Sequence, residues 1–218
     1  MEHWVESAKL LFRGSLYTMG ISAVAILCGS ILGLIIGTLT SRYFSFRIIK
    51  FFGNSYVTIV RGTPLFIQIL IIYFGLPSVI HLDPSPLVAG IIALSINSAA
   101  YLAENIRGGI NALPIGQWET AKVLGYKPHQ AFLFILYPQV FRNILPSLMN
   151  EFVALIKESS ILMVVGIPEL TKVSKDIVSR ELNPMEMYGL CAALYLVMTT
   201  TFSYVARVFE RGKHEYQS

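Results

Sequence analysis

Charged residues are scarce in this 218-residue chain. Only 14% of its residues are charged and 54% are hydrophobic, whereas soluble domains of this size carry about a quarter charged residues. There are two cysteines, Cys28 and Cys191, and both fall inside apolar runs. This pattern predicts neither a disulfide framework nor a zinc site. The composition is typical of a membrane protein with several spans.

Motifs that mark many enzymes are also missing. The chain has no G-x-x-x-x-G-K-[ST] phosphate loop, no H-E-x-x-H and no G-x-S-x-G, so we expect no ATP binding by that route and no hydrolase chemistry. Its aspartates, Asp83 and Asp176, lie outside the apolar runs. The +4 formal charge is spread over loops and ends and does not indicate a nucleic-acid partner. We therefore predict that the chain is not an enzyme and holds no cofactor or metal of its own.

Five apolar segments are long enough to cross a bilayer as helices, which takes about 20 residues each. They cover about residues 16–40, 55–79, 86–106, 144–165 and 185–208. The polar residues before the first segment predict an interfacial amphipathic helix. We predict an all-α membrane protein with one transmembrane domain over residues 1–218, five transmembrane helices, this N-terminal interfacial helix and one further short helix at about 117–127.

Basic residues between the predicted spans indicate an orientation. The first and third loops and the C-terminal tail are rich in Lys and Arg, and the second loop has none. By the positive-inside rule the basic loops and the C-terminus are cytoplasmic, which places the N-terminus outside. The fourth loop mixes Lys172, Lys175 and Arg180 with acidic residues, and we interpret it as an external helical excursion.

Polar residues share one face on two neighbouring spans. Asn97, Tyr101 and Glu104 follow i, i+4, i+7 spacing, and Glu151 and Glu158 are separated by seven residues. Ionisable groups inside a membrane are costly and indicate function unless they only pair with each other. Together with Ser160 and Gln68, these residues are the candidate substrate pathway. The alternative is that they lock helix packing, or that Glu104 only neutralises Arg107.

Two further patterns concern the first and second spans. Gly29, Gly33 and Gly37 recur every four residues, which makes a groove that another helix can approach closely, within the subunit or from a second one. Arg61 and Pro64 stand at the start of the second apolar run, where a broken helix frees backbone groups. They are candidates for a gate or a structural anchor.

A polar segment that looks helical lies between the third and fourth spans. It contains Glu119, Ala121, Leu124 and Gly125, and Pro138 follows. We expect a short amphipathic helix that Gly125 terminates, with the chain redirected at Pro138. Such a helix fits a groove in a partner or lies on its own membrane surface.

These residues resemble a known signature. Glu119-Thr120-Ala121, Gly125, Ile135 and Pro138 are similar to the E-A-A-x3-G-x9-I-x-L-P motif of permeases in binding-protein-dependent ABC importers, with Thr120 for Ala and Tyr137 for Leu. Further segments resemble the polar amino-acid permease family (the His/Glu/Gln/Arg/opine group): 61–64 with Gln68, 97–101 with Glu104, 107–110, 114–119 and 157–160.

The resemblance implies the transmembrane subunit of a type I ABC importer in a prokaryotic plasma (inner) membrane. Two permeases, identical or homologous, would pair and sit on two cytoplasmic ATPase subunits, which bind ATP and Mg. An external solute-binding protein would deliver the amino acid. The region 119–125 would be the coupling helix, through Glu119, Ala121, Leu124 and Gly125, and transport would proceed by alternating access.

The excess of carboxylates at Glu104, Glu151 and Glu158 over Lys157 favours a basic amino acid such as arginine, lysine or histidine. Alternatively, the pathway has no real site, and the binding protein selects glutamine, glutamate or another amino acid. A gradient-driven carrier or channel that uses Glu104 and Glu151 as relays is a rival hypothesis. A membrane scaffold without a transport role is another.

Overall fold

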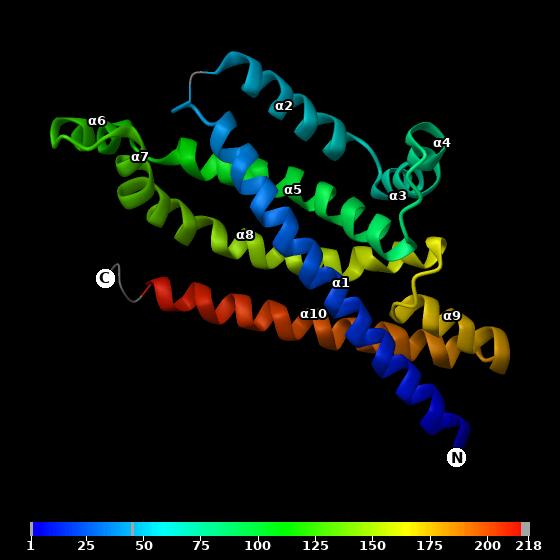
Figure 1. The fold of residues 1–218 in the computed structure, drawn as a ribbon. Coiled ribbons are helices and arrows are strands. Elements are labelled where there is room, and N and C mark those ends of the chain that lie inside the picture. The colour runs from blue at the N-terminus through cyan, green and yellow to red at the C-terminus, as the bar shows by residue number, and fades with distance from the viewer. Residues whose placement is uncertain (1, 45, 215–218) are drawn as a thin grey trace.

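The computed structural model describes residues 2–44 and 46–214, with side chains over 4–44 and 46–207, and within these ranges every regular element is helical. The α-helices are α1 (Glu2–Thr40), α2 (Arg47–Gly62), α3 (Leu65–Leu70), α4 (Leu76–Ile80), α5 (Pro86–Ala112), α6 (Ile115–Val123), α7 (Pro128–Ala131), α8 (Tyr137–Glu158), α9 (Leu170–Glu181) and α10 (Pro184–His214). Two π-helical turns, Ile71–Gly75 and Phe132–Leu136, and a 3-10 segment, Ser159–Val165, join some of them. In Figure 1, α1, α5, α8 and α10 form a layered bundle, and the short helices lie at its two ends.

Three of the described helices are long and apolar enough to cross a membrane: 4–40 in α1, 86–112 in α5 and 184–207 in α10. They match the first, third and fifth predicted spans. The N-terminal interfacial helix is not a separate element, because α1 runs without a break from residue 2 to residue 40. α8, which carries Arg142, Glu151, Lys157 and Glu158, is not among the three. The total of five spans therefore stays a prediction.

The second predicted span is a broken helix. α2 and the α3–α4 segment together have the length and composition of one span, but they are bent by 107° relative to each other. Thr63 is extended (φ −119°, ψ 144°) and Pro64 follows it. Proline disfavours the helical conformation of the preceding residue, so the helix ends at Gly62 and restarts at Leu65. The break expected at Pro64 is present, and it is sharp.

Two prolines are accommodated by wide turns instead of helix breaks. The N–H of Leu76 donates to the carbonyl of Ile71, and the N–H of Tyr137 donates to that of Phe132. Each bond closes a π-helical turn immediately before a proline, at Pro77 or Pro138, and a proline in an ordinary α-helix would clash with the carbonyl four residues back. The helical run that begins at Pro128 therefore continues through Pro138. Pro138 thus lies inside a continuous helical run, in the first turn of α8.

The fourth predicted span, 144–165, differs from the helix observed. α8 begins at Tyr137, holds Pro146 in its interior and ends at Glu158, after which the chain is 3-10 helical to Val165. Gly166 then adopts a left-handed φ of +83°, the conformation with which many helices end.

The glycine groove of α1 packs against α5 of the same chain. A Cβ built on Gly33 would lie 2.8 Å from the Leu102 Cβ, and one on Gly37 only 2.5 Å from the Ala103 carbonyl oxygen. The backbones touch because α5 is itself lined with small residues such as Ala99 and Ala103, both buried. Intrachain packing is therefore the correct interpretation of this groove, and it holds the first and third predicted spans together.

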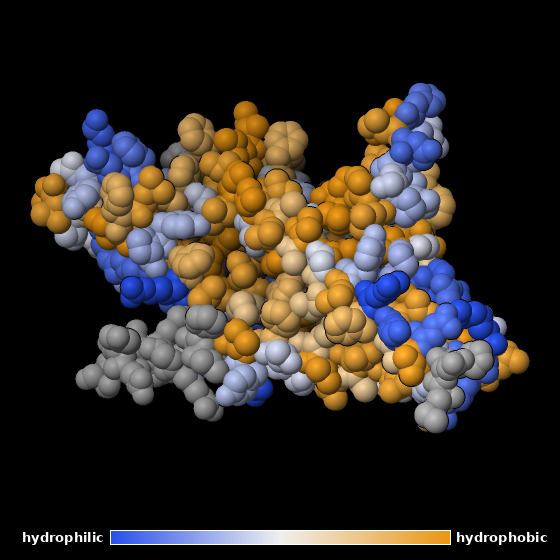
Figure 2. All heavy atoms as spheres, turned by 60° about the horizontal axis from the view of Figure 1, so that its bottom comes forward, coloured by the Kyte–Doolittle hydropathy of each residue, from blue (hydrophilic) through white to orange (hydrophobic). Residues whose placement is uncertain are grey.

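The elements separate into two ends around an apolar middle. In Figure 1 the α1–α2 connection, α6 and the last turns of α10 lie toward one end, and α4 and α9 toward the other. Figure 2 shows an apolar band between two hydrophilic regions. This grouping is the one that the basic loops predict, with α6 and α9 on opposite sides.

Candidate substrate pathway and coupling helix

Gln68 forms hydrogen bonds across the break between α2 and α3 and also to α5. Its amide nitrogen donates to the carbonyls of Val60 (2.8 Å) and Thr63 (3.1 Å) and to the Thr63 hydroxyl (3.0 Å). These carbonyls lie at the end of α2, where an interrupted helix leaves acceptors without intrahelical partners. The Gln68 amide oxygen accepts a 3.2 Å hydrogen bond from buried Asn97. The structure thus brings two predicted pathway residues together at the break beside Pro64.

Arg61 and Tyr101 meet next to this break. The Arg61 guanidinium lies 5.0 Å from the centre of the Tyr101 ring, and its Nη1 is 3.9 Å from a carboxylate oxygen of Glu104. Arg107 donates to the other Glu104 oxygen at 2.6 Å. Glu104 is therefore shared by two arginines, and all three side chains are partly exposed, by 34–41%. The neutralisation of Arg107 by Glu104 is real, and Arg61 joins it.

Two carboxylates remain on α8 away from any lysine or arginine contact within 4 Å among the described side chains. Glu151 is half-buried, and its electrostatic surroundings include Glu158, Arg61 and Ser98 of α5. The buried Ser98 hydroxyl lies next to the Glu151 carboxyl group, and one oxygen of Glu158 is buried without a hydrogen-bond partner in the described part of the chain. Polar atoms in this state are rare in proteins. Ser98 therefore joins the candidate pathway residues of α5 and α8. Its position next to Asn97 in the sequence is the feature that indicates this.

Ser160 is arranged differently from the other predicted pathway residues. Its hydroxyl donates to the Lys157 carbonyl at 2.6 Å within the same helical run. This local bond occupies the hydroxyl proton, so Ser160 offers only an acceptor to any ligand.

Gly125 ends α6 through a defined backbone motif. The N–H of Tyr126 donates to the Ala121 carbonyl and the N–H of Gly125 to the Lys122 carbonyl, both at 3.0 Å. These two bonds form a Schellman motif, in which the residue after the helix is left-handed. Gly125 has φ +82°, and a Cβ there would meet nothing within 4 Å. Glycine is therefore required for its conformation and not for space.

The apolar surface of α6 is different from the one expected. Ala121 is only 1% exposed and packs on its own chain, whereas Leu124 is 68% and Val123 87% exposed. Glu119 is exposed on the same short helix. Of the predicted apolar pair Ala121 and Leu124, only Leu124 can meet a partner directly. Val123 is the docking candidate that the sequence interpretation left out.

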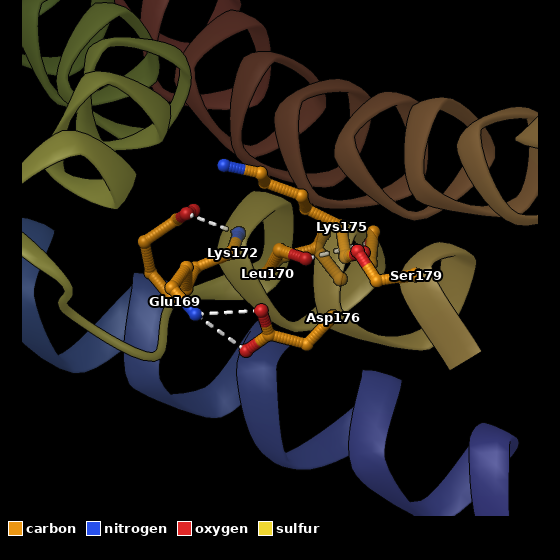
Figure 3. A network of polar contacts seen from close by, with 7 residues as sticks. Glu169, Leu170, Lys172, Lys175, Asp176 and Ser179 are labelled. Carbon is orange, nitrogen blue, oxygen red and sulfur yellow. Dashed lines mark hydrogen bonds and ion pairs between the residues drawn. The ribbon is translucent and has the colours of Figure 1, made fainter.

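At the end of the molecule opposite α6, the structure shows a buried carboxyl group, Glu169, that the sequence interpretation did not include. Glu169 is fully buried and accepts from the N–H groups of Thr171 (2.9 Å) and Lys172 (2.7 Å), so it caps the start of α9. The Tyr195 hydroxyl of α10 also donates to it, at 2.8 Å. Burial raises the pKa of the Glu169 carboxyl, and these hydrogen bonds oppose the shift. Figure 3 shows the cap beside the exposed Lys172–Asp176 pair, whose shortest contact is 2.6 Å. Position 169 after a proline and before a helical run was the available signal.

Among the side chains that the structure describes, in residues 4–44 and 46–207, no group of three or more His, Cys, Asp or Glu is placed to hold a metal ion. The arrangement offers a bent helix, carboxylates on α8 next to α5, and a small helix displayed at one end. These are the parts of a membrane transport subunit that responds to a partner.

The chain belongs to the family described as "Binding-protein-dependent transport system inner membrane component", which matches residues 29–214. It is thus the permease subunit of an amino acid ABC importer of the inner membrane. It is not itself an enzyme, since ATP hydrolysis in such systems takes place in a separate subunit, and the general partners of such a permease are an ATPase and a binding protein.

Three similar proteins illustrate the relationship. The chain is 36% identical over 205 residues to a glutamine transport system permease, GlnP, of Rickettsia conorii, covering 93% of each. It is 33% identical over 207 residues to the arginine transport system permease ArtQ of Bacillus subtilis, covering 95% of this chain and 94% of that protein. A crystal structure of an amino acid ABC transporter with histidines superposes with a TM-score of 0.87 at 39% identity, over 95% of this chain and 96% of the other.

Proposed function

We propose that α6 is the coupling helix and that Val123 and Leu124 seat in a groove of the ATPase subunit. The observation that carries this proposal is the exposure of these two neighbouring apolar side chains, 87% and 68%, at the end of a polar helix whose final turn is fixed by Gly125. Large apolar side chains on a hydrophilic end of a protein favour a partner interface. Glu119 and Lys122 flank them and supply the polar rim typical of interfaces.

A charge at position 123 tests this assignment. Val123→Asp should abolish co-purification of the ATPase subunit, because a carboxylate would have to be buried in the groove. Val79→Asp is the matched control, since Val79 is 75% exposed on α4 at the other end. If both variants retained the ATPase equally, α6 would not be the docking helix.

The assembly follows from this assignment. Two permeases, identical or homologous, pair with two ATPase subunits, which carry ATP and Mg, and the external binding protein docks at the end formed by α4 and α9. The C-terminus and α6 then face the cytoplasm and the N-terminus faces outward, with α8 as the fourth of five membrane-crossing elements. Cysteine labelling from each side of sealed vesicles, at residues 123 and 79, tests this orientation; labelling of both from the same side would contradict it.

We further propose that the permease favours basic amino acids. Glu104 is engaged by two arginines, so Glu151 and Glu158 are the carboxyl groups near the broken helix that have no ion-pair partner among the described side chains. These carboxyl groups suit the cationic side chain of arginine, lysine or histidine, and we assign Asn97 and Tyr101 of α5 to the polar ends of the substrate. Among the similar proteins, one is named for glutamine and one for arginine, so the alternative is that the binding protein alone selects the substrate.

The two alternatives differ in a measurable ratio. Glu151→Gln should lower the uptake of arginine relative to glutamine by about tenfold or more, because a hydrogen bond to a charged group contributes about 1.5–3 kcal/mol. Asp83→Asn, in the exposed connection before α5, is the control and should leave the ratio unchanged. An unchanged ratio in Glu151→Gln would assign selectivity to the binding protein. Uptake by the permease without any ATPase would instead support the gradient-driven carrier.

A further inference from the structure

Residues 41–44, between α1 and α2, contact the coupling helix from a distant part of the sequence. They lie at the same end of the molecule as α6 and α7 (Figure 1). Nothing in the length or composition of this connection indicates more than a short cytoplasmic turn. Its side chains nevertheless reach three separate elements.

Arg42 attaches this connection to the corner between α5 and α6. Its backbone N–H donates to the Asn111 side-chain oxygen at 2.9 Å, and its guanidinium donates to the Leu113 carbonyl. Asn111 belongs to the last turn of α5, and Leu113 lies between α5 and α6. Carbonyls at a helix end need partners from outside the helix. Arg42 thus holds the corner from which α6 starts.

Tyr43 and Phe44 continue the contact as an aromatic chain. The Tyr43 ring lies 5.0 Å from the Trp118 ring of α6, centre to centre, and the Arg42 guanidinium lies 4.9 Å from the Tyr43 ring centre. Phe44 meets Phe132 edge to face at 5.9 Å, just before α8. Aromatic and cation–π pairs at these distances are attractive beyond the burial of apolar surface. The connection therefore joins α1, α6 and the start of α8.

Besides residues 41–44, α6 contacts α7 and the π-helical turn Phe132–Leu136, and it buries Ala121 against its own chain. It is nine residues long, which is too short to be stable as an isolated helix. Leu113 and Pro114 are extended on one side and Gly125 is left-handed on the other, so both joints are outside helical conformation. A force on α6 would be absorbed at these joints unless side-chain contacts made it move together with the membrane helices. Tyr43 and Trp118 are half-buried and pack against the main core, which supplies such contacts.

We infer that Arg42 and Tyr43 are positioning residues for transport: they brace the coupling helix against α1 and α8, so that movement of α6 is passed to the spans. This inference rests on the proposed docking of the ATPase at α6. It assigns to the α1–α2 connection a part in energy coupling that is separate from ATPase binding.

The first experiment measures coupling in the complete transporter. The permease, ATPase and binding protein are reconstituted in liposomes, and uptake of labelled arginine and of labelled glutamine is compared with phosphate release. In Arg42→Ala and Tyr43→Ala the ATPase should still co-purify and hydrolyse ATP, while the amino acid moved per ATP should fall by about threefold or more, the size expected for loss of one coupled contact network. Tyr43→Phe keeps the ring and should restore coupling. Arg47→Ala removes another exposed arginine, at the start of α2, and serves as the matched control.

A second experiment reads the brace without any partner. The chain has two tryptophans, so Trp4→Phe leaves Trp118 as the only one. In the isolated permease, Tyr43→Ala in this background should shift Trp118 emission to longer wavelength because its ring loses cover, and Arg47→Ala should not. In the complete transporter of the first experiment, a double-mutant cycle of Tyr43→Ala with Trp118→Ala should show that the two effects on the uptake-to-hydrolysis ratio are not additive.

The outcomes distinguish a failure of this inference from a failure of the proposed docking of the ATPase at α6. An unchanged ratio in Arg42→Ala and Tyr43→Ala, with Val123→Asp still losing the ATPase, overturns the brace and leaves the docking intact. Loss of the ATPase together with uptake in the Arg42 and Tyr43 variants also overturns it, since the contacts would then only hold the fold. If Val123→Asp retained the ATPase, the docking proposal itself would fail. A lowered ratio with a normal ATPase content, rescued by Tyr43→Phe, supports the brace.

Discussion

The contact between α1 and α5 leaves no room for a side chain at Gly37, and this predicts a graded loss of stability on alanine substitution. A Cβ at Gly37 would lie 2.5 Å from the Ala103 carbonyl oxygen and 2.9 Å from the Ile106 Cβ. Comfortable contacts between such atoms lie near 3.5 Å, so the two helices would have to separate by about 1 Å at this point.

The expected cost follows from that separation. A gap of about 0.5–1 Å already forfeits a quarter to a half of each dispersion contact that it opens, and overpacking of a close-packed interior costs about 1–3 kcal/mol. Gly33→Ala, with Leu102 Cβ at 2.8 Å, and Gly29→Ala, with Ser98 Cβ at 3.0 Å, should cost progressively less. Gly20→Ala is the control within the same helix, because a Cβ there would meet nothing within 4 Å. This variant gains helix propensity from the change of Gly to Ala, as the other three do.

The assay is thermal unfolding of the purified permease in detergent, followed by circular dichroism. At about 2–4 °C per kcal/mol for a chain of this size, Gly37→Ala should melt several degrees below Gly20→Ala, with the other two variants between them. Should Gly37→Ala fail to fold, the order of Gly33→Ala and Gly29→Ala still tests the reasoning. Equal melting temperatures across the series, or the reverse order, would refute it.

Three further predictions concern α6, α9 and the broken helix. Gly125→Ala should lower the free energy of unfolding by about 1–2 kcal/mol, because the left-handed φ at this position strains any residue with a Cβ, and it should weaken ATPase binding measured by titration. Gly116→Ala, at an open position of the same helix, should have neither effect. Equal effects of the two substitutions would contradict the conformational argument. Burial raises the pKa of Glu169 in the folded protein above the ordinary value of 4.5. The folded protein therefore binds the carboxyl proton more tightly than the unfolded chain does. The contribution of Glu169 to stability thus falls as the pH rises from 4.5 through the raised pKa. Glu169→Gln should remove that component, and melting curves of the two proteins that stay parallel from pH 4 to 8 would sink the assignment. Gln68→Leu should lower stability by about 1–3 kcal/mol by leaving the Asn97 amide and the α2 carbonyls without partners; in a double-mutant cycle with Asn97→Ala, a coupling energy of zero would show that the 3.2 Å bond contributes nothing.

The sequence by itself determined the class of the molecule. Low charge, long apolar runs and the spacing from Glu119 to Pro138 are properties of the linear chain, and they identified a helical membrane permease and the place of α6. They also located the start of α5 at Pro86 and the break at Pro64, because proline acts on its immediate neighbours through local sterics. Gly125 was recognised for the same reason, since its requirement is a backbone angle.

What depended on contacts between distant residues was decided only by the tertiary structure. The glycines of α1 fit a partner helix equally well inside or between subunits, and only the packing shows that the partner is α5. Glu104 had one visible arginine at i+3, and the bend at Pro64 supplied the second, Arg61. Ala121 and Val123 are both apolar, but the way α6 lies on its own chain buries one and exposes the other. Burial, pairing and the contact of Arg42 with the α5–α6 corner depend on where the backbone brings residues together, and spacing along one helix cannot encode that.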